Sequence, residues 1–228
     1  MLRFLIGRAR RMTMTRHKPF GPGLTTGILK VSLCDREPEV ARSFARSFHG
    51  ADGVEVLEGD LLGLDCDALV SPANSFGFMD GGIDRAIDRF YDGAAQRAVM
   101  GRIAERFHGE LPVGAATVIG MAGRRFPFLV VAPTMRVPGD VRGTLNAYLA
   151  MRAAFAAVLD FNAAGSERIA SVAVPGLCTG VGGMSAEESA VQMRAAYDMI
   201  VCGGWRGIAH PAFAPFALEP RTTKNRIG

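Results

Sequence analysis

Residues 67–84 read DALVSPANSFGFMDGGID, and they pass from a strand pattern through a glycine-rich turn into a helix pattern. The apolar run 67–71 is predicted to be a buried strand, with Pro72 directly behind it. A helix that begins near Gly81 leaves its first backbone N–H groups without intrahelical acceptors. Such a turn attracts anions, phosphates above all, because the N–H groups and the helix dipole both favour negative charge. The stretch therefore predicts an anion-binding loop at the end of a sheet strand.

A second stretch with the same organisation is 174–184, VPGLCTGVGGM. It joins a predicted strand, 169–174, to a predicted helix, 185–200. Ser185, followed three residues later by Glu188, forms a capping box that marks the helix start. Neither glycine-rich loop has the spacing of the Rossmann or P-loop fingerprints. Two such loops side by side would hold a diphosphate, whereas the glycines of a single loop more often only make a tight turn.

Short apolar runs alternate with helical patterns over the rest of the chain. This alternation predicts an α/β layered domain, in which ligands gather at the loops that follow the strands. We expect one folded domain over 27–203, a basic and flexible leader over 1–26, and an irregular segment over 204–228. The expected strands are 28–33, 54–57, 67–71, 115–119, 128–133 and 169–174, and the expected helices are 38–48, 81–100 with a break near 93, 95–107, 143–159 and 185–200.

The positive charge of the chain lies at its two ends. The 228 residues carry 26 Lys and Arg against 22 Asp and Glu, a net charge of +4. Six bases lie in residues 1–18, which have no acid, and residues 219–228 add three bases and one acid. The body, 19–218, is left with 17 bases and 21 acids, a net charge of −4. A basic face for duplex DNA is therefore not expected, and contact with nucleic acid is expected only through the basic termini.

The remaining composition argues against membrane and metal-binding proteins. Hydrophobic residues make up 49% of the chain, but no apolar run reaches the length of about 18 residues that a membrane-spanning helix needs. The N-terminal stretch lacks the apolar segment of a secretory signal. The four cysteines form no CxxC pair and the four histidines show no i+4 pairing, so we expect no metal. Cysteines of this kind fit a reducing, cytoplasmic location.

Three motifs in this order carry a resemblance to a known family. They are Gly-Asp at 59–60, Ala-Asn-Ser at 73–75 and Thr-Gly-Val at 179–181. From residue 54 to about residue 200 the chain resembles a macro domain, the ADP-ribose-binding module. The spacing from Asn74 to Asp84 equals that of the MacroD-type hydrolases. The resemblance implies a macro-like domain with the architecture of a three-layer α/β/α sandwich around a mixed central sheet.

The resemblance also implies roles for individual residues. Asp60 would accept the exocyclic amine of adenine, Asn74 would contact the distal ribose, and Asp84 would place water against C1″ of that ribose. The implied catalytic residues are therefore Asp84 and Asn74, the implied ligand is ADP-ribose or an ADP-ribosylated substrate, and no cofactor is implied. The implied ligand-binding residues are Asp60, Leu61, Asn74, Gly81, Gly82, Ile83, Thr179, Gly180, Val181, Gly182 and Gly183.

The chain departs from the family pattern close to the implied site. Asp88 stands where the MacroD-type enzymes have a histidine, and Phe-Met-Asp at 78–80 replaces glycine-rich sequence. Gly182 takes the place of an aromatic residue that packs on the distal ribose. No apolar strand is evident after the last helix. These departures indicate a divergent bacterial or phage-like subgroup, in which ligand binding carries over better than hydrolysis.

Each implied role has a structural alternative. Asp60 would cap a turn, Asn74 would hold its own loop, and Asp84 would stabilise the first turn of a helix. Asp84, Asp88 and Asp92 also repeat at i+4, which suggests either a solvated acidic face or a divalent-cation site. Three functions stay open: hydrolysis of ADP-ribosyl esters or O-acetyl-ADP-ribose, non-catalytic reading of ADP-ribose or a related nucleotide, and association with nucleic acid.

Overall fold

The computed structural model describes residues 29–121, 125–165 and 167–208. The expected leader, 1–26, and residues 209–228 of the expected C-terminal segment lie outside these ranges, so these two predictions stay predictions. Among the helices of the described ranges, none is long and apolar enough to cross a membrane.

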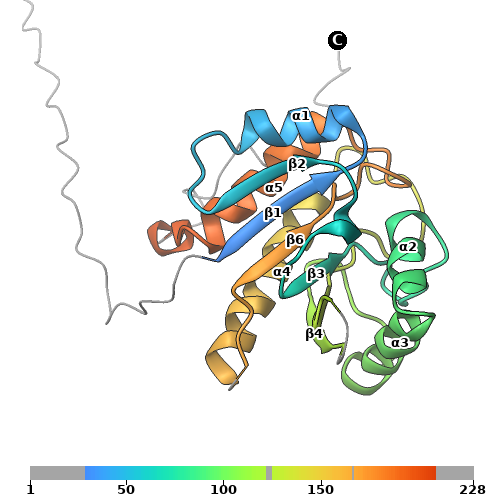
Figure 1. The fold of residues 1–228 in the computed structure, drawn as a ribbon. Helices are drawn as coiled ribbons and strands as arrows, with labels where there is room; N and C mark the ends of the chain where they lie inside the picture. Colours follow the sequence, from blue (N-terminus) through green and yellow to red (C-terminus); the bar gives the residue numbers. More distant parts are fainter. Residues whose placement is uncertain (1–28, 122–124, 166, 209–228) are drawn as a thin grey trace, which may run out of the picture.

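A six-stranded sheet forms the centre of the described chain (Figure 1). Its strand order is β2-β1-β6-β3-β5-β4. Neighbouring strands run parallel except for β5 and β4, which pair antiparallel, so the sheet is mixed as the resemblance implies. The strands are β1 (Lys30–Asp35), β2 (Val54–Glu58), β3 (Ala68–Ser71), β4 (Thr117–Gly120), β5 (Phe128–Val131) and β6 (Ser171–Val174).

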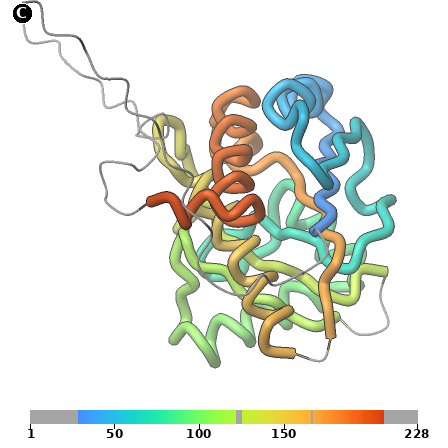
Figure 2. The backbone as a smooth tube through the Cα atoms, turned by 90° about the vertical axis from the view of Figure 1, so that its left-hand side faces the viewer, coloured from blue at the N-terminus to red at the C-terminus, as the bar shows by residue number. Residues whose placement is uncertain are grey.

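The sheet buries both of its faces because side chains alternate across each strand. On β3, Ala68 and Val70 belong to one hydrophobic cluster, whereas Leu69 belongs to another. Helices α1, α4 and α5 close the first cluster, with α1 and α5 next to each other in Figure 2, and α2 and α3 close the second. The predicted three-layer α/β/α sandwich is therefore confirmed. The helices are α1 (Pro38–Ser47), α2 (Gly82–Phe90), α3 (Ala94–Phe107), α4 (Asn146–Ala164) and α5 (Ala186–Ile200).

Backbone conformation explains where several helices begin and end. Asp92 and Gly93 adopt the left-handed conformation, with φ of +53° and +76°, and this turn separates α2 from α3 at the predicted break. The helix predicted from residue 143 begins only at Asn146, since Gly143 has a φ of +69°. At the start of α5, the Ser185 side chain accepts the backbone N–H of Glu188, as the capping box predicts.

The N-terminal strand–helix unit is an integral part of the core. β1 lies between β2 and β6, and α1 packs against α5. Within the described residues that follow α5, the chain forms only a short 3-10 helix, η2 (Gly204–Gly207). The closing strand that is not evident in the sequence is therefore also missing up to residue 208, and the interior position next to β6 belongs to β1.

The topology brings three loops to one edge of the sheet. β3 pairs in parallel with β6 on one side and with β5 on the other. Parallel neighbours end at the same edge, so the loops that follow these three strands lie side by side. Both glycine-rich stretches are among them.

Candidate functional site

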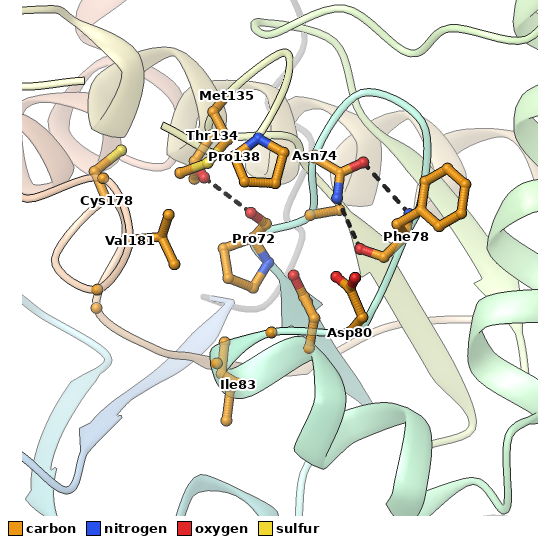
Figure 3. A pocket seen from close by; sticks show the side chains of 17 residues that line it. Pro72, Asn74, Phe78, Asp80, Ile83, Thr134, Met135, Pro138, Cys178 and Val181 are labelled. Carbon is orange, nitrogen blue, oxygen red and sulfur yellow. Dashed lines mark hydrogen bonds between the residues drawn. The ribbon is translucent and has the colours of Figure 1, made fainter. Parts of the chain in front are cut away.

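The three loops enclose a pocket with a cavity volume of about 170 Å3 (Figure 3). The loop after β3 contributes lining residues between Pro72 and Asp84. The loop after β5 contributes residues between Thr134 and Pro138, and the loop after β6 contributes residues between Gly176 and Gly182. The two loops that were singled out from the sequence therefore face each other across one cavity.

Asp84 is a carboxylate of this pocket whose pKa is raised. It lies in the first turn of α2, and Oγ of the fully buried Ser71 donates a 2.6 Å hydrogen bond to its Oδ1. Burial raises the pKa of Asp84 from 3.8 to about 6, and the bond from Ser71 opposes this rise. As a whole residue Asp84 is half-buried, because one side of it lines the cavity. The site thus holds a carboxylate that is more basic than usual and still mostly ionised at neutral pH.

Asn74 lines the pocket, but its side chain is committed to its own loop. Its Nδ2 donates a 2.7 Å hydrogen bond to the carbonyl oxygen of Phe78, as Figure 3 shows. Its Oδ1 accepts the backbone N–H groups of Phe76 and Phe78 at 3.1 and 3.3 Å. Asn74 thus holds its own loop, as the structural alternative for this residue predicts. A contact of Asn74 with ribose would have to coexist with these three hydrogen bonds.

The loop after β6 is shaped by close packing of its backbone. A Cβ atom on Gly176 would lie 2.8 Å from Oδ2 of Asp35, which accepts the Gly176 N–H at 3.0 Å. A Cβ atom on Gly182 would lie 2.6 Å from the carbonyl oxygen of Cys178 and 2.7 Å from Cγ2 of Val141. The N–H of Val141 also donates to the carbonyl oxygen of Gly182 at 2.9 Å. Val141 therefore fills the space beside Gly182, where the family pattern has an aromatic side chain.

Asp60 and Leu61 lie at the end of the edge strand β2, outside the pocket lining. Asp60 caps the short 3-10 helix η1 (Leu61–Gly63), with Oδ1 accepting the N–H of Leu62 at 3.1 Å. Its other oxygen is 2.9 Å from Nη2 of Arg36 in an exposed ion pair. Asp60 thus has the turn-capping contact that was its structural alternative, and its role toward adenine stays a prediction.

The pocket collects most of the residues that were predicted to bind ligand, but not all of them. Sequence reasoning missed the loop after β5, whose Thr134 donates from Oγ1 to the carbonyl oxygen of Pro72 at 2.9 Å. The available signal was the segment APTMR at 132–136, directly after a predicted strand. The predicted residues that line the cavity are Asn74, Gly81, Gly82, Ile83, Asp84, Gly180, Val181 and Gly182, whereas Asp60, Leu61, Thr179 and Gly183 do not.

The i+4 acidic repeat does not form one face. Asp92 lies beyond the end of α2, in the left-handed turn. Asp88 accepts the N–H of Gln96 at the start of α3 with a 2.8 Å bond, while Asp84 bonds Ser71. Among the described residues, no group of three or more His, Cys, Asp or Glu is arranged to hold a metal ion. The expectation of a stacked acidic face is wrong, because the helix ends before its third member.

Comparisons with known proteins agree with this architecture. The chain is 31% identical over 140 residues to an uncharacterized protein of Aquifex aeolicus, covering 61% of this chain and 78% of that protein. It is 33% identical over 147 residues to an uncharacterized protein of Aeropyrum pernix, covering 64% of this chain and 71% of that protein.

Macrodomains are among the solved structures that resemble the chain. The macrodomain of Mycobacterium tuberculosis DarG matches with a TM-score of 0.52 and 25% identity, over 62% of this chain and 88% of that one. A macrodomain mutant of Oceanobacillus iheyensis, solved with ADPR, matches with a TM-score of 0.52 and 19% identity, over 63% and 75%; this second likeness concerns the fold alone. The family model described as Macro domain matches residues 70–193, more than half of the 228 residues. The chain therefore belongs to the macro domain family.

Proposed function

We propose that the chain binds ADP-ribose, with the diphosphate between the loops after β3 and β6. The observation that carries the proposal is that a helix start and a glycine-rich loop face one cavity. α2 begins at Gly82 behind Gly81, which has no side chain to cap the first N–H groups. These N–H groups and the helix dipole favour an anion at this place. Membership of the macro domain family, for which the resemblance implies ADP-ribose as the ligand, supports the same ligand class.

The size of the cavity divides the proposed ligand into two parts. A cavity of about 170 Å3 is smaller than the roughly 300–1,000 Å3 of pockets that enclose a drug-sized ligand. It therefore takes the diphosphate and distal ribose, while the adenosine part extends along the edge of the sheet toward Asp60. Arg36 pairs with Asp60 in an exposed ion pair, and such pairs are worth only about 0–1 kcal/mol. An adenine amine can therefore displace Arg36 at small cost.

Calorimetry with ADP-ribose tests the proposal, with ADP, AMP and ribose 5-phosphate as comparators. Gly81→Glu places a carboxylate at the cavity wall, where no atom lies within 4 Å of the new Cβ. We expect at least tenfold weaker binding of ADP-ribose, since the added charge repels the diphosphate. Gly101→Glu is the matched control, because Gly101 on α3 has equally open space and does not line the pocket. An absence of heat with ADP-ribose, or equal affinity in both variants, would contradict the proposed site.

A second function, hydrolysis of ADP-ribosyl esters or O-acetyl-ADP-ribose, is favoured by Asp84. A general base works best when its pKa lies near the working pH, and burial brings the pKa of Asp84 to about 6. In the proposed step, Asp84 accepts a proton from water as the water oxygen bonds to C1″. The bond from C1″ to the ester oxygen breaks, and the acid leaves as its carboxylate.

Release of ADP-ribose from a substrate that carries an ester at C1″ of the distal ribose separates the hydrolase from a non-catalytic reader. Asp84→Asn keeps the size of the side chain and removes the base, so we expect turnover to fall by at least a hundredfold while binding survives. Asp65→Asn, which changes an exposed aspartate outside the pocket, is the control. Turnover that is equal in the two variants would exclude Asp84 as the base. No turnover in the unmodified protein would favour the reader.

A further inference from the structure

Ser71 is held in a fixed place beside the pocket by the strand that carries it. It is the last residue of β3, and its side chain is fully buried. Its Cα lies opposite that of Val131 on β5, and its carbonyl oxygen accepts the N–H of Ala132 at 3.0 Å. A short side chain on a backbone fixed on this side has little freedom to move its hydroxyl group. The Oγ atom is therefore a fixed donor behind Asp84, outside the residues that line the pocket.

The hydroxyl group of Ser71 selects one of the two oxygen atoms of Asp84. It donates to Oδ1 at 2.6 Å, within the range of a hydrogen bond to a charged acceptor. Within the described part of the chain, the structure gives the Asp84 side chain this one hydrogen bond. The second oxygen, Oδ2, is therefore the atom left to accept a proton from a molecule in the cavity that Asp84 lines.

We propose that Ser71 is a positioning residue that fixes Oδ1 of Asp84, directs Oδ2 to the cavity and favours the ionised carboxylate. The part of this proposal that concerns turnover rests on the proposed hydrolase function. The part that concerns the carboxylate does not, since it holds in the protein without ligand. A serine hydroxyl suits both states of Asp84, because it donates to the carboxylate and accepts from the protonated acid.

The titratable and charged groups around the site are exposed, neutral or bonded elsewhere, so the group that favours the ionised form of Asp84 is the Ser71 hydroxyl. On the loop before α2, Asp80 is exposed at the cavity, and on α2 itself Arg85 is exposed while Asp88 is bonded to the N–H of Gln96. On the loop after β6, Cys178 has its pKa raised by burial to about 12 and stays neutral. On the loop after β5, Arg136 is paired with Glu110. β3 contributes only Ser71, so the opposing influences on the pKa of Asp84 are burial, which raises it, and the Ser71 bond, which lowers it.

The test is a titration of the Asp84 carboxyl carbon by NMR in the ligand-free full chain, with the resonance assigned by its loss in Asp84→Asn. Removing the hydroxyl in Ser71→Ala should move the titration midpoint upward by about one pH unit, because the ionised form loses its donor. Ser71→Cys keeps the size and a weak donor, so its midpoint should lie between the two. Ser43→Ala is the control, since Ser43 is equally buried on α1 and bonds Arg46 instead.

Two outcomes decide the proposal. A midpoint in Ser71→Ala equal to that of the unmodified protein overturns it, and so does an equal shift in Ser43→Ala. If Ser71→Ala does not fold, the nearly isosteric Ser71→Cys carries the same comparison. In turnover assays, Ser71→Ala should lower kcat about tenfold at neutral pH and move the rising limb of the pH profile upward, with KM nearly unchanged. A chain without turnover would overturn the hydrolase function and leave the titration result to stand by itself.

Discussion

The two loops that face the pocket look alike in sequence and are stabilised in different ways. Both follow a parallel strand, contain several glycines and lead into a helix. The loop after β3 is held by side chains, with Asn74 bonding the backbone at Phe76 and Phe78 and with Ser71 bonding Asp84. The loop after β6 is held by close packing that leaves no room for a Cβ at Gly176 or Gly182, and the Asp35 side chain accepts the N–H of Gly176. The first loop therefore leads into the carboxylate with the raised pKa, whereas the glycines of the second loop fix the shape of the pocket wall.

In the first loop, we expect the largest effect on stability and turnover from a substitution of Asp84. Its pKa is about 6 in the folded chain against an ordinary 3.8, so the folded state binds this proton more tightly than the unfolded state. The cost of ionising Asp84 is therefore absent below about pH 4, grows as pH rises, and is complete above about pH 6. The difference amounts to at most about 3 kcal/mol, and the exposure of Asp84 to the cavity makes this an upper figure.

Asp84→Asn should raise the free energy of unfolding by about 1–3 kcal/mol at pH 7.5 and change it little at pH 4. Urea unfolding at the two pH values measures this. If the gain is the same at both values, the burial of a charge is not its cause. A gain in stability together with a loss of turnover would show that this loop carries a carboxylate at the expense of stability.

Gly182→Ala tests whether the second loop depends on the absence of a side chain at Gly182. The new methyl group would lie 2.6 Å from a backbone carbonyl oxygen, which cannot rotate away as a flexible side chain can. We expect a loss of about 1–3 kcal/mol in unfolding free energy and weaker ligand binding. Gly180→Ala is the control in the same loop, because nothing lies within 4 Å of its added Cβ. Equal losses in the two variants would mean that the loop tolerates no side chain at all, whatever its neighbours.

The two loops also show how much of the site could be predicted from the sequence. The strand–turn–helix order around Asn74 and Asp84 could be predicted, because glycine positions and hydrophobic periodicity are local properties of the sequence. The place of Val141 beside Gly182 could not, since it depends on the loop after β5 folding over the loop after β6. The Ser71–Asp84 bond was missed for the same reason: it joins the end of a strand to the start of a helix across thirteen residues.

The sheet repeats this division between local and long-range information. The alternation of strands and helices predicted a layered α/β domain, the resemblance implied its three layers, and the six strands lie within a few residues of their predicted ranges. The strand order did not follow from any pattern, because β1 pairs with β6 from the far end of the described chain. The first strand of the described chain is therefore an interior strand, between β2 and β6.

Asn74→Ala tests how much of the first loop depends on one side chain. The substitution removes three hydrogen bonds, two of them to backbone N–H groups, and we expect a loss of about 1–3 kcal/mol. Amide hydrogen exchange at Phe76 and Phe78 should accelerate. Asn162→Ala is the matched control, since Asn162 holds the backbone of Ile169 by a donor and an acceptor bond away from the pocket. Stability should fall in both variants, but the affinity for ADP-ribose should fall only in Asn74→Ala. A loss of affinity in both variants would mean that Asn74 has no local role at the pocket.

Asp80→Asn should have the smallest effect, and it tests the charge rather than the shape of the first loop. Asp80 is exposed and lines the cavity on the side of the helix start, where the proposed diphosphate binds. Removing this like charge should tighten ADP-ribose binding two- to fivefold at low salt, with the gain shrinking as ionic strength rises because exposed charges are screened. The same substitution should leave binding of an uncharged ribose analogue unchanged. A gain that persists at high salt would point to a steric cause. Weaker binding would mean that Asp80 bonds the ligand directly. In that case the first loop, like the second, would be fitted to the shape of the ligand.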